Sequence, residues 1–212
     1  MTPTEVRLQL CRHGFVPIPV VGKRPVLDGW QKRGETSPGD VDLWATLFPD
    51  AGNTGILTRA TPTLDLDIIY AAAAEAAEAK VRERFEEIGD IHVRFGKSPK
   101  RAIFFRTNEP FTKIQVPLIA PNGDTTQKIE FLGDGQQVVV HGQHPETGQP
   151  YSWYGGALCE TSCEDLPYIR EAEARQLVDD IVAVLEAEFG YRRAQQRAKP
   201  GKGNGGAAEP LP

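Results

Sequence analysis

The chain of 212 residues has no apolar run long enough to span a bilayer, which requires about 20 apolar residues as a helix. Its first ten residues, MTPTEVRLQL, lack the charged and apolar pattern of a signal peptide. Cysteine is scarce, and the odd count of three excludes a framework of paired disulfides. We therefore expect a cytoplasmic protein of one ordinary domain, with no membrane partner.

The three cysteines permit one alternative, a zinc site. Cys159 and Cys163 are spaced C-x₃-C, and Cys11 with His13 offers two further ligands. Zinc ligands usually come as two tight pairs, and Cys11-x-His13 is not such a pair. Isolated reduced thiols are the interpretation that the spacing favours.

The charge is unevenly distributed. The net charge of −5 argues against a protein that coats DNA. Two segments are nevertheless basic: residues 94–106 carry five cations and no acid, and residues 23–33 carry four cations around Asp28. Local basic patches on an acidic chain are typical of a site that binds phosphates in one cleft.

Hydrophobic periodicity predicts an α+β fold. We expect helices at residues 4–13, from Ser37-Pro38 up to Pro49, at 71–88 and at 173–189. We expect strands at 15–21, 53–57, 64–69, 92–95, 101–106, 128–132, 136–141 and 151–154. The prolines of the first strand indicate a sheet edge, and Gly133-Asp134-Gly135 indicates a hairpin between residues 128–132 and 136–141.

The last part of the chain has the composition of a linker. Residues 192–212 are rich in Gly, Pro and Ala, show no periodicity, and carry five basic residues and one acid. We predict a folded domain over residues 1–191 and a flexible tail over 192–212. The tail is either a natural terminus or the link to a further domain of a longer polypeptide.

Three carboxylates form a candidate metal site. Asp65 and Asp67 alternate with apolar residues in a predicted strand, so both project from one face. Glu130 has the same setting in the strand Lys128–Leu132. Adjacent carboxylates repel each other unless a cation lies between them, and Mg²⁺ and Mn²⁺ prefer oxygen ligands. The alternative is that these acids simply cover solvent-exposed strand faces.

A basic hairpin follows the Asp-x-Asp strand. The segment Gly96-Lys97-Ser98-Pro99-Lys100-Arg101 offers a hydroxyl and three cations, and the apolar residues 102–105 anchor it on a core strand. Lys and Arg neutralise phosphates, and Arg does so bidentately. The segment is either a triphosphate-binding loop or a solubilising turn.

An ordered set of motifs now points to a family. In order, the chain shows Gly-Lys-Arg-Pro-x-x-x-x-Trp, Asn-Thr-Gly-Ile, the Asp-x-Asp strand, the basic hairpin, the acidic strand, and the segment His144-Pro-Glu-Thr-Gly-Gln-Pro-Tyr151-x-Trp153. This set, over about residues 6–168, resembles the N-terminal primase-polymerase (PrimPol) domain of the archaeo-eukaryotic primase superfamily. It is most similar to versions from phages, plasmids and integrated elements.

The resemblance implies an RRM-like sheet plus an N-terminal α/β subdomain, with the active-site cleft between them. It implies template-directed nucleotidyl transfer by a DNA primase or polymerase with two Mg²⁺ or Mn²⁺ ions. The expected partners are single-stranded DNA, NTP or dNTP, and a helicase domain downstream. It implies metal ligands Asp65, Asp67 and Glu130, nucleotide-binding residues Lys97, Ser98, Lys100, Arg101 and His144, and nucleotide or template contacts Lys23 and Arg24.

The sequence departs from the family at one position. The family often has Ser-x-x-x-His on the strand after Asp-x-Asp, and the His position is Ala102 here. Lys100 or Arg101 can supply the missing cation, and His141 is a less favoured substitute. Two other functions stay open: a metal-dependent nuclease, and a catalytically silent nucleic-acid-binding module attached to a helicase.

Overall fold

A computed structural model describes residues 1–194. The helices of this part are α1 (Pro3–Arg12), α2 (Pro38–Leu47), α3 (Ala71–Phe85) and α4 (Glu171–Phe189). The strands are β1 (Pro17–Val21), β2 (Arg24–Pro25), β3 (Asn53–Leu57), β4 (Thr63–Asp67), β5 (Val93–Phe95), β6 (Arg101–Phe104), β7 (Ile114–Ile119), β8 (Lys128–Leu132), β9 (Gln137–His141), β10 (Ser152–Tyr154) and β11 (Arg192–Arg193). Short 3-10 turns lie at Trp30–Lys32, Leu158–Glu160 and Cys163–Asp165.

Local sequence signals explain where the helices begin and end. Thr2 and Ser37 form capping boxes with Glu5 and Asp40, so their side chains satisfy the first free N–H groups of α1 and α2. Gly190 ends α4 in the left-handed region, at φ 69°. No helix in residues 1–194 combines the length and the apolar character that crossing a bilayer requires.

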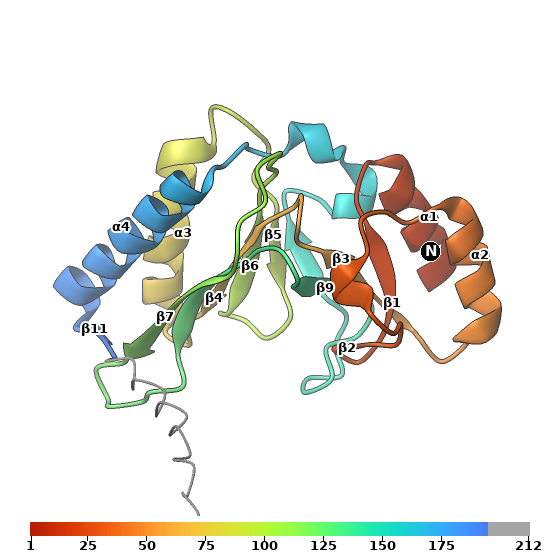
Figure 1. Cartoon of the computed structure of the whole chain (residues 1–212). Coiled ribbons are helices and arrows are strands. Elements are labelled where there is room, and N and C mark those ends of the chain that lie inside the picture. The colour runs from red at the N-terminus through yellow and green to blue at the C-terminus, as the bar shows by residue number, and fades with distance from the viewer. Residues whose placement is uncertain (195–212) are drawn as a thin grey trace, which may run out of the picture.

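The strands form two antiparallel sheets, which confirms the predicted α+β class (Figure 1). The small sheet has the order β2-β1-β3-β9, and the large sheet has the order β10-β5-β6-β4-β8-β7-β11. Figure 1 shows α3 and α4 on one side of the large sheet, and the small sheet with α1 and α2 on the other.

The main core lies between the large sheet and the helices α3 and α4. Leu64 and Leu66 of β4 are fully buried there, against Ala77 and Val81 of α3 and Leu177 of α4. Because side chains alternate along a strand, Asp65 and Asp67 point to the opposite face. That face looks toward the small sheet.

The second core joins the two sheets. Ala102 and Phe104 of β6 pack with Val138 and Val140 of β9, together with residues of α1. The polar face of β4 is therefore placed at the junction of the sheets, where a cavity forms beside this apolar contact.

Two expectations need correction, and one strand was not predicted. The predicted hairpin of residues 128–132 and 136–141 is wrong: β8 pairs with β4 and β7, whereas β9 pairs with β3 in the other sheet. Strand β1 is not a full edge, because β2 pairs with Val20 and Val21, although Pro17 and Pro19 lie beyond that pairing. Strand β7 was not predicted, because it contains Pro117 and a proline within an apolar run argues against a strand.

The boundary of the expected linker also shifts. Arg192 and Arg193 pair with Leu118 and Ile119, so the first residues of the predicted tail belong to the large sheet. The rest of that prediction, residues 195–212, lies outside the described residues.

Candidate active site

The three predicted carboxylates share one face of the large sheet. Asp65 of β4 lies directly opposite Glu130 of β8 on one side and Ala102 of β6 on the other. Asp67 lies opposite Lys128, two residues further along β4. Directly opposed residues of antiparallel strands have neighbouring side chains, so Asp65 and Glu130 are close neighbours on this face.

Lysines neutralise two of these carboxylates. The Nζ atom of Lys100 lies 2.7 Å from Oδ1 of Asp67, and that of Lys128 lies 2.7 Å from Oε2 of Glu130. Lys113 contacts the other carboxylate oxygen of Glu130. The residue Glu130 is only 4 % exposed. Asp65 has no comparable ion pair among the residues of the described part.

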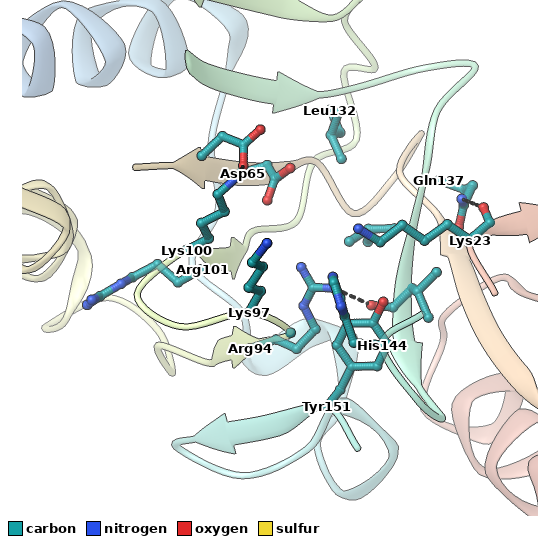
Figure 2. Close-up of a pocket in the computed structure, with 14 residues that line it drawn as sticks. Lys23, Asp65, Arg94, Lys97, Lys100, Arg101, Leu132, Gln137, His144 and Tyr151 are labelled. Carbon is teal, nitrogen blue, oxygen red and sulfur yellow. Dashed lines mark hydrogen bonds and ion pairs between the residues drawn. The ribbon is translucent and has the colours of Figure 1, made fainter. Parts of the chain in front are cut away.

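A cavity of about 190 Å³ opens beside Asp65 and Asp67 (Figure 2). Its walls come from both sheets and from three connecting loops, and five of the lining residues are cationic. These are Lys23, Arg94, Lys97, Lys100 and Arg101. A pocket with carboxylates on one wall and cations on the others suits a phosphate ester that binds together with metal ions.

Asn53 holds two loops of the cavity in place. Its side-chain amide donates to the carbonyl oxygens of Gly22, at 2.7 Å, and Gln143, at 2.8 Å. Its Oδ1 accepts from the backbone N–H of Gln143 at 2.9 Å. Because Lys23 and His144 directly follow these anchored residues, the buried Asn53 fixes the backbone positions from which both side chains project. The Asn-Thr-Gly-Ile segment belongs to the motifs of the family resemblance, but the motif alone does not indicate this role of Asn53.

His144 and Tyr151 form the floor of the cavity. Their rings contact edge to face, with centroids 5.6 Å apart. Burial lowers the pKa of His144, and nearby Lys23 lowers it further, which favours the neutral imidazole. Gly96 permits this packing, because a Cβ there would lie 2.6 Å from Cε1 of Tyr151 and 2.7 Å from Cδ2 of His144.

A known protein family matches the part of the chain that contains this site. The family model described as Prim-Pol, bifunctional DNA primase/polymerase, N-terminal, matches residues 8–168. The chain belongs to this family. Prim-Pol proteins are metal-dependent nucleotidyltransferases of DNA replication, with DNA and nucleotides as substrates. No curated protein matches the chain as a relative.

The Prim-Pol match contains every residue that lines the cavity, from Lys23 to Tyr151. It also contains Glu130, and it ends before helix α4, which only supports the back of the large sheet.

The structure brings together only some of the predicted nucleotide-binding residues. Lys23, Lys97, Lys100 and His144 line the cavity with Asp65 and Asp67. Ser98 and Arg24 are exposed and are not among its lining residues.

Arg101 lines the cavity close to its backbone, but its guanidinium points away, as Figure 2 shows. Its Nη1 lies 2.5 Å from Oε2 of Glu78 in α3, on the helix-covered face of the sheet.

Arg94 is a cavity residue that sequence reasoning missed. It lies in β5, is 9 % exposed, and its Nη1 donates to the carbonyl oxygen of Val139 at 2.8 Å. The available signal was a charged residue inside the predicted apolar strand 92–95, which is the argument that singled out Glu130.

The carboxylates fit hard cations by their chemistry. Burial raises the pKa of Asp65, Arg94 opposes this shift, and the charges of Asp67 and Glu130 add to it. A divalent cation between the acids would relieve this repulsion. Within residues 1–194 no three acidic, His or Cys side chains converge as a metal site. Asp67 and Glu130 are instead paired with Lys100, Lys113 and Lys128.

Proposed function

We propose that the chain catalyses template-directed nucleotidyl transfer, as a DNA primase, a DNA polymerase or both. The attacking group is a 3′-hydroxyl, the target is the α-phosphate of a nucleotide, and pyrophosphate leaves. The observation that carries the proposal is the placement of Asp65, Asp67 and Glu130 on one sheet face, next to a cavity lined by cations.

Asp65, Asp67 and Glu130 would hold two Mg²⁺ or Mn²⁺ ions. When bound, such ions lower the pKa of the attacking hydroxyl and neutralise the charge that develops on the phosphate. The carboxylates supply the negative charge that selects divalent cations. The buried position of Glu130 keeps its orientation fixed.

The cations around the cavity would bind and orient the triphosphate. Lys97 and Lys100 lie on the hairpin between β5 and β6, and each is ion-paired with an acid that it can exchange for phosphate: Glu146 for Lys97 and Asp67 for Lys100. Neutral His144 offers a hydrogen bond rather than a charge. Ser98 stays in the proposed nucleotide-binding set as a neighbour on the same hairpin. Arg101 would bind nucleotide only if its guanidinium left Glu78.

The template strand would cross the small-sheet side of the cavity. Lys23 lines the cavity there, and exposed Arg24 follows it in β2. Both are proposed to contact nucleotide or template phosphates.

The wider setting follows from the family resemblance. We propose a primase-like arrangement, with an RRM-like sheet and an N-terminal subdomain around the cleft, over residues 1–191. Residues 192–212, of which Arg192 and Arg193 pair with β7, are proposed as the link to a helicase domain. The proposed context is the replication of a phage, plasmid or integrated element in the host cytoplasm.

The test is incorporation of labelled nucleotide with Mn²⁺ on bare and on primed single-stranded DNA. Elongated products support the proposal, whereas shortened DNA supports a nuclease. Asp65→Asn and Asp67→Asn should both abolish incorporation. The matched control is Asp134→Asn, since Asp134 is a carboxylate paired with Arg59 outside the cavity. The proposal is refuted if the parent binds DNA but incorporates no nucleotide on bare or primed single-stranded DNA in the presence of metal. That result would favour a silent binding module.

A further inference from the structure

A row of opposed residues crosses the large sheet at the level of Asp65. From the β10 edge inward it contains Trp153, Arg94, Ala102, Asp65 and Glu130. Since directly opposed residues share a face, Arg94 projects on the same side as the carboxylates. Within this row only the methyl group of Ala102 separates Arg94 from Asp65.

The guanidinium of Arg94 is held by few partners. One N–H of Nη1 bonds the carbonyl oxygen of Val139, and the group stacks over the ring of Tyr151, 4.7 Å from its centroid. The Nε atom is buried and has no hydrogen-bond partner. A buried donor without a partner is unfavourable, so this group is prepared for an acceptor that enters the cavity.

The other cations of the cavity are already paired with acids. Lys23 and Lys97 share Glu146, at 3.9 and 2.9 Å, Lys100 pairs with Asp67, and Arg101 pairs with Glu78. Among the lining residues of the described part, Arg94 is the cation that has no carboxylate within 4 Å. An anion that enters the cavity meets this charge without displacing an acid.

We propose that Arg94 is the fixed anchor for the triphosphate of the incoming nucleotide. This deepens the proposed function, on which it rests. A guanidinium is always charged and presents several N–H donors in one plane, which matches the oxygens of a phosphate. The bond to Val139 and the stack on Tyr151 orient that plane before the ligand arrives. The lysines then close around the triphosphate by exchanging their acids for phosphate oxygens.

The experiment measures the binding of dATP and of inorganic tripolyphosphate, each in excess Mg²⁺, to the whole chain by calorimetry. Arg94→Gln removes the charge and should raise both dissociation constants by about 10–100-fold, the usual effect of losing charge-assisted hydrogen bonds. Arg94→Lys keeps a point charge and should lose less. Binding of single-stranded DNA should change little in either variant.

Arg106→Gln is the matched control. Arg106 also bonds a backbone carbonyl, that of Leu166 at 3.0 Å, and also stacks over a tyrosine, Tyr168 at 5.5 Å. It lies outside the cavity, so its loss should leave the binding of dATP unchanged while it lowers the melting temperature.

Equal affinity of the parent and of folded Arg94→Gln for both phosphate ligands would overturn the inference. If Arg94→Gln does not fold, the decision falls to Arg94→Lys, whose unchanged affinity would overturn it as well. A parent that binds the ligands through Arg94 but incorporates no nucleotide would leave the inference intact and refute the polymerase function. If Arg94→Gln incorporates nucleotide as well as the parent does, the inference is refuted and the polymerase function stands.

Discussion

Replacing Asp65 by asparagine is expected to stabilise the fold while it abolishes catalysis. Asp65 is partly buried, has no lysine partner among the described residues, and lies directly opposite Glu130. Asparagine keeps the shape of the side chain and removes its charge. Catalytic sites commonly retain such unfavourable charges, and their removal then raises stability.

The magnitude follows from the geometry. Carboxylates on opposed strand residues lie about 6 Å apart, and at an effective dielectric constant of about 20 their repulsion is about 3 kcal/mol. The lysines on Glu130 and the guanidinium of Arg94 offset part of this repulsion. We therefore expect a net gain of about 1 kcal/mol in the free energy of unfolding at pH 7.

The gain should depend on pH. Because the pKa of Asp65 is raised in the folded state, the folded protein binds the extra proton more readily than the unfolded chain does. The parent therefore loses stability as the pH rises through the folded pKa, whereas Asp65→Asn does not. The two proteins should converge below about pH 4, near the unfolded pKa of an aspartate.

The assay is urea unfolding of both proteins between pH 4 and pH 8 without metal. Asp67→Asn is the control on the same strand, because Asp67 is paired with Lys100 and its loss should be neutral or destabilising by up to about 1 kcal/mol. If Asp65→Asn is less stable than the parent at pH 7, the carboxylate is satisfied in the folded state and the reasoning is wrong.

Three further predictions concern the same region. Adding Mg²⁺ or Mn²⁺ should raise the melting temperature of the parent but not that of Asp65→Asn, as thermal scans with and without EDTA would show. Gly96→Ala should displace the rings of Tyr151 and His144 and destabilise the fold by about 1–3 kcal/mol, with a higher KM for nucleotide than the parent. Arg101→Gln and Glu78→Gln should each destabilise the fold by about 3 kcal/mol, and the double variant by less than the sum, since their side chains are 7 % and 14 % exposed.

Much of the secondary structure could be predicted from short-range signals. The capping motif at Ser37 and the alternation around Asp65 each depend on neighbours in sequence, and both led to the observed elements. The pairing of strands could not be predicted in the same way. The Gly133–Gly135 turn looks like a hairpin, yet the chain uses it to pass from one sheet to the other.

The residues of the candidate site also differ in whether local sequence patterns predict them. Asp65 and Asp67 were found because they share a strand, and Glu130 because a charge stands in an apolar strand. Arg101 was assigned with Lys100, but Arg101 already belongs to β6, where it lies opposite Leu66. Leu66 is on the helix-covered face of the sheet, so the guanidinium of Arg101 reaches Glu78 there. Arg94 shows that a residue can belong to the cavity through cross-strand pairing with Ala102, which no local motif records.

The passage of the chain between the sheets has a consequence for synthesis and folding. Strand β3 has one unpaired edge until β9 is synthesised. Strand β9 follows β8 in the chain, so the central strands of the large sheet are synthesised before it. The small sheet is therefore completed by contacts between residues far apart in sequence, which slow folding. A nascent chain that stops before Gln137 lacks Val139, the anchor of Arg94. Residues of both sheets line the cavity, so a fragment that keeps the cavity must contain both sheets.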